Sequence, residues 1–464
     1  MLLGKQIIFK DIMLTSRIAS DSVSIGKITL GGNSALAVQS MTNSDTNSVE
    51  DTVNQVKRIA EAGADLVRIS VPSSKEVIAM KEIKARLCAD GYTLPLVADV
   101  HFNPKVAEAM ASIVEKVRIN PGNYVDKRVF NTAEMSEGEY AASLQKMSDR
   151  AKPLFEICKQ NGTAIRIGVN HGSLCNRIIN RYGNGPLAMA MSAMEWVDIC
   201  EEQQFSQVLF SLKSSNVLTM IDAVTLLAEK MRERGRCYPL HLGVTEAGSG
   251  LDGRVKSAVG IGTLLLNGLG DTIRVSLTEK PENEIPFAQA LLKAVNAIPE
   301  NSYQILTDRK LISNHAEPDR DIWIAHIASL CGYEHYKTPL KDIIINNPCF
   351  SRPENEALSA AILQACRIKI SKTEIISCPT CARTQYDIES VLEMVKKRFS
   401  QMPGLKIGIM GCIVNGPGEM ADADYGIVGA THGKVAVYQG KERVSGVIAV
   451  SEALDILEEL IEKH

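Results

Sequence analysis

The chain has 464 residues, of which 45% are hydrophobic and 23% charged, a composition typical of globular proteins of about two or three domains. Its net charge of −3 and aromatic content of 5% give no reason to expect nucleic acid or an anionic membrane surface as a partner. No apolar run reaches about 18 residues, so no transmembrane helix is expected.

Residues 1–17 contain too short an apolar run for a secretory signal and no small-residue cleavage site. The 11 cysteines are scattered along the chain. In a reducing compartment most such cysteines are buried apolar side chains and a few are ligands. We therefore expect a cytoplasmic protein.

Between residues 35 and 277 an apolar, β-branched run, a polar end and a helical stretch follow one another repeatedly. The runs occupy residues 35–41, 64–71, 94–100, 114–121, 163–170, 207–214, 239–245 and 271–277. Eight such units over about 240 residues predict an α/β domain of the TIM (β/α)8 barrel type at residues 20–280. A doubly wound open sheet is the alternative, because its strands are equally apolar.

Charged and polar side chains stand at the ends of these strands, in "VRIS", "VRIN", "IRIG" and "IRVS" among others. In a barrel they meet at the carboxyl-terminal rim, where active sites form. Several cations on one rim repel one another unless an anion lies among them, and guanidinium groups suit phosphate oxygens. The pattern predicts a dianionic or diphosphate substrate, with a structural ion-pair network as the alternative. The candidate residues are Arg68, Asp99, His101, Arg118, Asn120, Arg166, Asn170, Lys213, Glu246, Arg274 and Ser276.

The pattern changes after the barrel. Residues 281–354 are less regular, begin like a linker and show no recognisable chemistry. Residues 355–464 predict a compact α+β domain, in which "TEIISC" and "LKIGIMGC" are strands that end at Cys378 and Cys412.

The motifs "SCPTC" and "GCIVNGPGE" permit three interpretations. Cys378 and Cys381 form a thioredoxin-like redox pair, or half of a zinc site, or they bind an iron–sulfur cluster together with Cys412. The glycine-rich loop after Cys412 suits a backbone close to a cluster. Glu419 is the candidate fourth ligand of such a cluster. A carboxylate binds cluster iron weakly, so the fourth iron would keep an exchangeable coordination position. Otherwise Glu419 is an ordinary loop carboxylate.

Taken together, the chain resembles the family of 4-hydroxy-3-methylbut-2-en-1-yl diphosphate synthases, iron–sulfur enzymes of the methylerythritol phosphate route to isoprenoids. The resemblance covers almost the whole barrel and the C-terminal domain. The stretches that carry it are "VQSMTNSDT", "ADLVRISVPS", "PLVADVHFNP", "VRINPGN", "IRIGVNHGSL", "HLGVTEAG", "SCPTCART" and "MGCIVNGPGE".

The resemblance implies a [4Fe–4S] cluster held by Cys378, Cys381, Cys412 and Glu419. It implies reductive ring opening of 2-C-methyl-D-erythritol 2,4-cyclodiphosphate to (E)-4-hydroxy-3-methylbut-2-enyl diphosphate, with two electrons from flavodoxin or ferredoxin. The rim cations, with Asn170 and Ser276, are then expected to clamp the diphosphate. Glu246 is the candidate proton donor, or an acid that supports it from behind, and Asp99 and His101 are expected to orient substrate or rim cations. A thiol–disulfide oxidoreductase fused to a phosphate-binding barrel is the alternative function.

The stretch "NHGSL" and the residues after it resemble the family form that has a large extra domain between barrel and cluster domain. Only residues 281–354 occupy that place here, too few for a second barrel. The cluster then reaches the rim either within one chain or from the partner chain of a head-to-tail homodimer.

Overall fold

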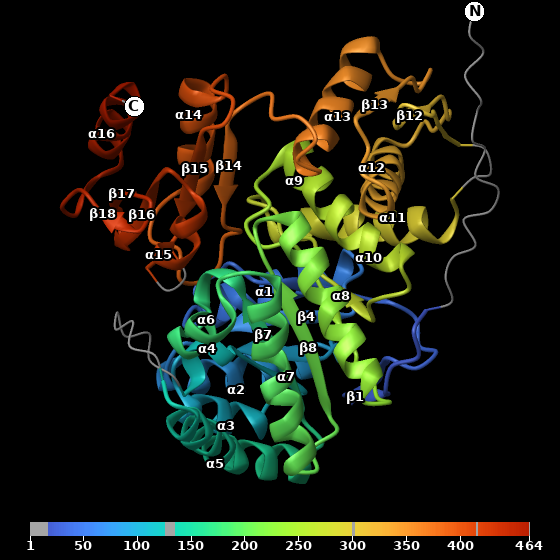
Figure 1. The fold of residues 1–464 in the computed structure, drawn as a ribbon. Helices are drawn as coiled ribbons and strands as arrows, with labels where there is room; N and C mark the ends of the chain where they lie inside the picture. The colour runs from blue at the N-terminus through green and yellow to red at the C-terminus, as the bar shows by residue number, and fades with distance from the viewer. Residues whose placement is uncertain (1–16, 126–134, 299–301, 414–415, 464) are drawn as a thin grey trace, which may run out of the picture.

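The computed structural model describes residues 17–125, 135–298, 302–413 and 416–463. Eight strands form a sheet in the order β8-β7-β6-β5-β4-β3-β10-β9 with every pairing parallel, and a parallel bridge between Phe210 and Leu240 joins β8 to β9. The predicted barrel is confirmed, with one strand in each predicted run (Figure 1). The strands are β3 (Ala37–Met41), β4 (Leu66–Ser70), β5 (Leu96–Asp99), β6 (Lys116–Ile119), β7 (Ala164–Asn170), β8 (Val208–Lys213), β9 (His241–Leu242) and β10 (Thr272–Ile273).

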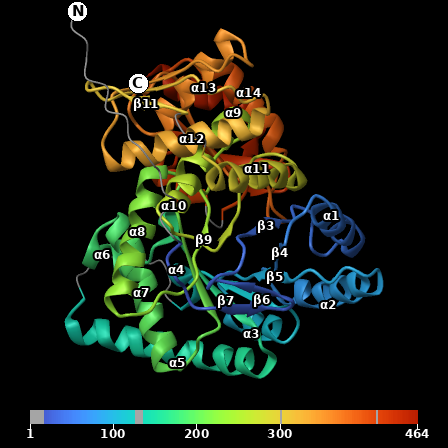
Figure 2. The same ribbon diagram turned by 90° about the vertical axis from the view of Figure 1, so that its right-hand side faces the viewer.

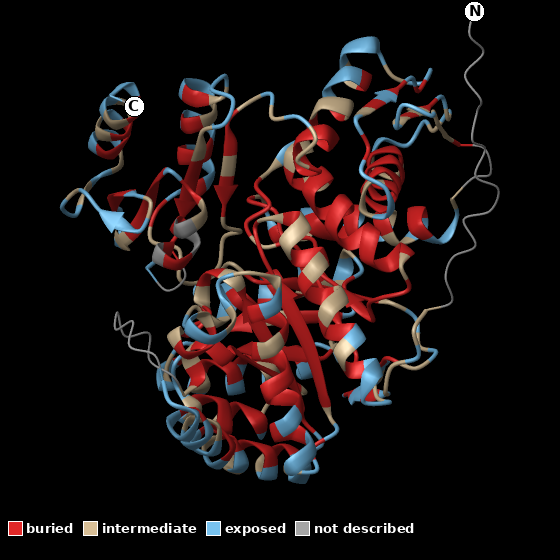
Figure 3. Ribbon diagram, in the orientation of Figure 1, coloured by how far each residue is buried: buried red, intermediate tan, exposed pale blue. Residues whose placement is uncertain are grey.

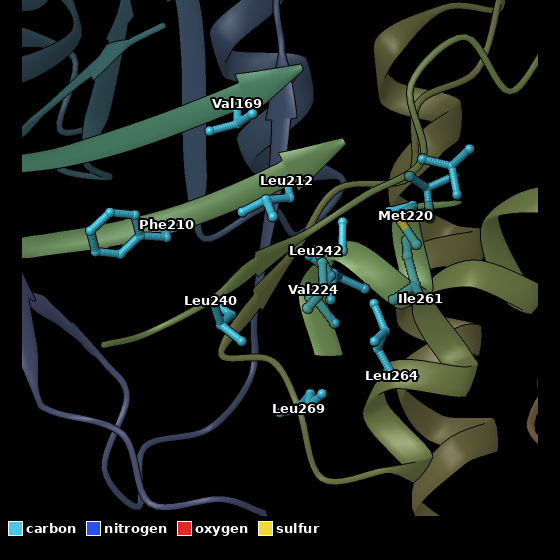
Figure 4. Close-up of a cluster of buried hydrophobic side chains, with 14 of the residues drawn as sticks. Val169, Phe210, Leu212, Met220, Val224, Leu240, Leu242, Ile261, Leu264 and Leu269 are labelled. Carbon is cyan, nitrogen blue, oxygen red and sulfur yellow. The ribbon is translucent and has the colours of Figure 1, made fainter. Parts of the chain in front are cut away.

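Helices follow the strands and cover the outside of the barrel. Gly63 (φ 99°), Gly91 (φ 85°), Gly162 (φ 66°) and Gly235 (φ 74°) each follow the end of one of these helices in the left-handed region, a conformation that ends a helix at little steric cost. Figure 4 shows Met220 and Val224 of α8 among apolar side chains from β8, β9 and α10. The helices are α1 (Val49–Glu61), α2 (Ser74–Ala89), α3 (Pro104–Ala111), α4 (Pro121–Tyr124), α5 (Glu137–Asn161), η1 (His171–Ser173), α6 (Asn176–Tyr182), α7 (Pro186–Glu202), α8 (Val217–Glu233), α9 (Gly250–Ser257), η2 (Ala258–Gly262) and α10 (Thr263–Leu266).

The barrel interior changes from apolar to charged along its axis. At the amino-terminal end, Leu66, Val97 and Leu209 pack with the hairpin of β1 (Val23–Ile25) and β2 (Ile28–Leu30). Toward the other end, alternate residues of one strand bring Lys116 and Arg118 onto the same face, both buried. Because buried charges are costly, the carboxyl-terminal half of the interior is built for something other than stability.

The segment expected to be a linker is folded. It forms η3 (Pro281–Asn283), α11 (Glu284–Asn296), β11 (Gln304–Ile305), β12 (Lys310–Ser313), α12 (Arg320–Lys337), β13 (Asp342–Ile345) and α13 (Arg352–Ala365). The strands make a separate sheet in the order β11-β12-β13. The expected start of the C-terminal domain at residue 355 also differs from the structure, because Leu358, Ile362 and Cys366 of the α13 region share the core of the barrel.

The C-terminal domain begins at β14 and has its own sheet and core. Strand order is β14-β15-β16-β17-β18, with β19 paired to β17; β14, β15 and β16 are parallel and the remaining pairs antiparallel. The elements are β14 (Glu374–Ser377), α14 (Ile388–Phe399), β15 (Lys406–Met410), α15 (Gly416–Glu419), η4 (Met420–Asp422), β16 (Tyr425–Thr431), β17 (Lys434–Gln439), β18 (Glu442–Arg443), β19 (Ile448–Ala449) and α16 (Val450–Glu462). Both predicted cysteine-bearing strands are present, and each cysteine follows its strand directly or within two residues.

The C-terminal domain and the helices of residues 281–365 both lie over one end of the barrel (Figures 1 and 2). Figure 3 shows that the barrel strands are buried along most of their length. In the described part of the chain, no helix combines the length and the apolarity that crossing a membrane requires.

Candidate active site

One cavity lies between the carboxyl-terminal rim of the barrel and the C-terminal domain. Both domains of the same chain line it. The barrel contributes Met41, Arg68, His101, Arg118, Arg166, Asn170, Lys213, Thr245, Glu246, Arg274 and Ser276, and the C-terminal domain contributes Cys378, Pro379, Thr380, Cys381, Arg383, Met410, Gly411, Cys412 and Gly416.

Direct contacts hold the cysteine-bearing loop on the rim. Nδ2 of Asn43 donates to Oγ1 of Thr380 at 2.7 Å, and the hydroxyls of Thr278 and Ser377 are 2.9 Å apart. A parallel bridge also joins Ala247 to Ser377. Of the two arrangements that the sequence leaves open, this structure has the one in which cysteines and rim belong to one chain.

Asp99 is the carboxylate around which the rim cations gather, and its side chain is fully buried. Its oxygens lie 3.2 Å from Nη1 of Arg118, 3.6 Å from Nη2 of Arg68 and 3.5 Å from Nη2 of Arg383. Burial alone raises the pKa of Asp99, but the neighbouring positive charges outweigh it and hold the pKa well below its usual value. Asp99 therefore stays ionised, and three guanidinium groups share its single charge.

His101 is a neutral neighbour of this group. Its Nε2 lies 2.9 Å from Nη1 of Arg118 and 3.2 Å from Oδ2 of Asp99. Burial lowers the pKa of His101 to about 3, and the attraction of Asp99 only partly offsets the effect. His101 consequently positions Arg118 without adding a positive charge.

Several buried cation donors at the rim have no partner among the described residues. Arg166 donates from Nη1 to Oγ of Ser211 at 2.8 Å, but its Nε and Nη2 have none, and neither does Nε of Arg118. Lys213 is also buried, and burial together with Arg166 lowers its pKa well below the usual value. Unsatisfied buried donors are costly, so an anion that binds among them explains the arrangement better than fold stability does.

Two glycines make room for these cations. A Cβ on Gly168 would lie 2.5 Å from Nε of Arg118, and one on Gly243 would lie 2.6 Å from Nζ of Lys213. Nη2 of Arg118 in turn donates to the carbonyl of Gly168 at 3.0 Å. The absent side chains at these positions let the cations lie across neighbouring strands.

Arg274 differs from the other cations because it has a carboxylate of its own. Glu284, at the start of α11, accepts from Nη2 of Arg274 at 3.0 Å and from Nε at 3.2 Å. Oγ of Ser40 and the backbone N–H of Leu277 also donate to Glu284. The expectation that residues 281–354 carry no chemistry is corrected by this carboxylate, which fixes a rim cation.

The remaining rim candidates separate into two groups. Asn170, Ser276 and Glu246 line the cavity, Glu246 with a positive φ of 51°. Asn120 is not part of the cavity lining: its Oδ1 accepts from the N–H of Gly122 and its Nδ2 donates to Ser173. Asn120 thus caps the short helix α4, whose first residue is a proline.

The three cysteines line the opposite side of the cavity from the barrel rim. The backbone N–H of Gly411 donates to Sγ of Cys378 at 3.1 Å, a contact of the kind that tunes cluster thiolates. Three soft sulfur donors and a backbone N–H directed at one of them fit an iron–sulfur cluster. Glu419 ends α15, and its side chain lies outside what the structure describes.

The thioredoxin-like interpretation is disfavoured by the environment of Cys378. Burial raises the pKa of its thiol well above the usual value, and the hydrogen bond from the Gly411 N–H only partly offsets this effect. A nucleophilic redox cysteine needs the opposite, a lowered pKa.

Three cavity or supporting residues were missed from the sequence. Arg383 and Met41 line the cavity, and Nε of Arg68 lies 3.0 Å from Sδ of Met41. Glu284 supports Arg274 from a different element. Arg383 could have been identified from the sequence, because it is a cation two residues after the "CPTC" motif. For Met41 and Glu284 the sequence offers no indication of a role beyond the residue type.

Comparison with known proteins assigns the family. A family model described as the GcpE TIM-barrel domain matches residues 20–289, and one described as the GcpE protein C-terminal domain matches residues 374–463. Relatives from Bacteroides fragilis and Chlamydia pneumoniae are 38% and 34% identical, and the matches cover 98% and 97% of this chain and 97% and 96% of theirs. Both relatives are 4-hydroxy-3-methylbut-2-en-1-yl diphosphate synthases (flavodoxin).

The alignment with the Bacteroides fragilis relative spans 606 positions, whereas this chain has 464 residues, so at least 142 positions (606 less 464) have no residue of this chain. This chain is therefore a shorter form than that relative. Among solved structures, a dihydropteroate synthase from Xanthomonas albilineans is 19% identical to this chain. The match covers 60% of this chain and 100% of that protein, with a TM-score of 0.37.

The chain therefore belongs to the GcpE family, the 4-hydroxy-3-methylbut-2-en-1-yl diphosphate synthases, oxidoreductases that reductively open 2-C-methyl-D-erythritol 2,4-cyclodiphosphate to 4-hydroxy-3-methylbut-2-enyl diphosphate in isoprenoid biosynthesis.

Proposed function

We propose that the two domains divide the reaction between them. Residues 20–280 bind the diphosphate, residues 281–354 support the barrel rim, and the C-terminal domain, expected from residue 355 and here folded from Glu374, holds a [4Fe–4S] cluster. The observation that carries this proposal is a cavity lined both by the rim cations of the barrel and by the three cysteines of the C-terminal domain.

Arg68, Arg118, Arg166, Lys213 and Arg274 bind the diphosphate oxygens. All five line one cavity, and Arg118, Arg166, Lys213 and Arg274 are buried there. Further support comes from the donors of Arg118 and Arg166 that lack partners among the described residues. Asn170 and Ser276 add neutral polar contacts on the same wall. Asp99 and His101 hold Arg118 in place, so that the cations are oriented before substrate arrives.

Cys378, Cys381 and Cys412 hold the cluster, with Glu419 as the exchangeable fourth ligand. A reduced cluster held by these residues would supply the electrons and a Lewis-acidic iron for the oxygen that leaves as water. The other protein groups bind and orient the substrate in the cavity.

Glu246 is the proton donor in this proposal. It is 3% exposed, lines the cavity, and is close enough to Cys378 that its charge helps to raise the pKa of that thiol. A carboxyl group on the lining of this cavity supports a role in giving the departing oxygen its proton.

Flavodoxin is the proposed electron donor, because the relatives are named as flavodoxin-dependent synthases, and ferredoxin is the alternative. Reduced electron donors of this type and free cysteines are features of the cytoplasm. A cytoplasmic location is proposed on the same ground.

Anaerobic purification tests the proposal. The protein should contain about four iron and four sulfide per chain and should turn over the cyclodiphosphate with a chemical reductant. Cys381→Ala should lose iron and activity, whereas Cys88→Ala, an exposed cysteine on α2, should keep both. A colourless, metal-free protein, or one with zinc alone, would refute it.

A further inference from the structure

Arg383 belongs to the C-terminal domain but reaches into the barrel rim. It follows Cys381 by two residues, and its side chain is 13% exposed. Nη2 lies 3.5 Å from Oδ2 of Asp99, which is 284 residues away in the sequence. Arg383 is therefore a rim cation that the second domain supplies.

The guanidinium of Arg383 is only partly used by the protein. Its Nε and Nη1 are buried and have no hydrogen-bond partner among the described residues. At 3.5 Å the contact between Nη2 and Asp99 is longer than a well-formed hydrogen bond. Such a buried guanidinium is costly unless a further acceptor reaches it.

The charges around Arg383 leave room for an anion. Asp99 is shared with Arg68 and Arg118, at 3.6 and 3.2 Å. The guanidinium group of Arg383 is a permanent cation, because arginine is not deprotonated in proteins. One carboxylate does not balance three guanidinium groups, and a diphosphate supplies the charge that is missing.

We propose that Arg383 is a substrate-binding residue, which donates its free Nε and Nη1 hydrogens to the diphosphate from the side of the C-terminal domain. The proposal rests on the function proposed above. Arg383 shares one loop with Cys378 and Cys381. Contact between Arg383 and the diphosphate therefore also sets the position of that loop relative to the substrate. Substrate binding and the seating of the C-terminal domain are thereby coupled.

The planar fork of arginine is essential to this role. Nη2 remains toward Asp99, while Nε and Nη1 donate in two other directions to separate phosphate oxygens, an arrangement that a lysine with a single nitrogen does not reproduce. Arg383→Lys should raise the KM for the cyclodiphosphate about 10-fold and Arg383→Gln up to about 100-fold. In both variants kcat should change less than KM, within about threefold, because ground-state binding is what they lose.

The test uses anaerobically purified holoenzyme of wild type, Arg383→Lys, Arg383→Gln and a control, Arg398→Gln. Arg398 lies on α14 of the same domain, is exposed and pairs with Asp455 and Glu458. Iron and sulfide content, steady-state kinetics and calorimetric binding of the cyclodiphosphate are measured. The expected result is unchanged cluster content in all four proteins and weaker binding only in the Arg383 variants.

Two results would overturn the assignment. An unchanged KM and binding constant in both Arg383 variants with full cluster content would show that Arg383 does not touch substrate. Loss of iron in Arg383→Lys as well as Arg383→Gln would give Arg383 a role in holding the cluster. Failure of the wild type to turn over the cyclodiphosphate would instead refute the proposed function itself, so the two failures are distinguishable.

Discussion

Nη2 of Arg274 lies 3.0 Å from Oε1 of Glu284, and both side chains are only 3% exposed. This pair joins the last strand of the barrel to the first helix beyond it. It separates Arg274 from Arg68 and Arg118, which share Asp99, and from Arg166, which has buried donors without partners in the described part of the chain.

Glu284→Gln should therefore destabilise the protein and misplace Arg274. Removing one partner of a buried ion pair typically costs about 3–5 kcal/mol, because the other charge stays buried without compensation. Urea unfolding and kcat/KM for the cyclodiphosphate measure the two effects. Glu282→Gln is the control, since Glu282 pairs with the exposed Arg58 and should lose less than about 1 kcal/mol.

Gly168→Ala should lower activity without changing the cluster. The added methyl group would lie 2.5 Å from Nε of Arg118 and would push that guanidinium away from Asp99. A rise in KM of about 10-fold is expected for the loss of one charge-assisted contact. Gly138→Ala is the matched control, because a Cβ there meets nothing within 4 Å; equal kinetics in the two variants would contradict the role of Gly168.

Lys213→Met should abolish turnover yet stabilise the substrate-free fold. Burial and the nearby arginines lower the pKa of Lys213 in the folded protein well below 10.5, its ordinary value in the unfolded chain. At a pH between these two pKa values the unfolded chain binds a proton on Lys213 and the folded protein does not. Wild-type stability therefore falls as pH decreases below about 10.5, and the Lys213→Met variant, which has no amine to protonate, escapes that loss.

Thermal unfolding at two pH values measures this effect. For each kcal/mol that the substitution adds to the free energy of unfolding, the melting temperature of Lys213→Met should exceed that of wild type by about 2–4 °C. The difference between the two melting temperatures should be larger at neutral pH than at about pH 9.5. Lys81→Met, an exposed change on α2, should show no pH-dependent gap. A less stable Lys213→Met would mean that Lys213 is a structural cation.

Glu419→Ala tests the fourth cluster ligand. A carboxylate that completes the ligand set should matter for retention, so iron content and turnover should fall while thermal unfolding of the barrel stays unchanged. Glu442→Ala, in the exposed strand β18, is the control. Wild-type iron content and activity in Glu419→Ala would remove this residue from the ligand set.

The barrel and the place of its rim residues were predictable because both depend on local patterns. Each strand is an apolar run with a polar end, so Arg68 or Arg166 could be placed at the rim from its own strand. An asparagine followed by a proline, as at residues 120 and 121, is also typical of a helix N-terminus, and in the structure Asn120 caps α4. Asn120 was expected only to bind substrate.

The rest depends on contacts between distant segments. Nothing in a local pattern pairs Asp99 with Arg383 or Arg274 with Glu284, and only the packing of the domains brings the first pair together. The segment after the barrel resembles a linker in sequence because its short strands and mixed helices lack strong periodicity. Its order comes from packing against the barrel.

Co-expression of two inactive variants tests most directly whether one chain forms the whole site. Arg166→Met disables the barrel wall and Cys412→Ala disables the cluster wall, and the two chains carry different tags. Because rim and cysteines meet within one chain, the purified mixture and any doubly tagged species should be as inactive as each variant alone. Recovered turnover of the cyclodiphosphate would show that an intact barrel takes its cluster from a second chain, and would contradict the arrangement described here.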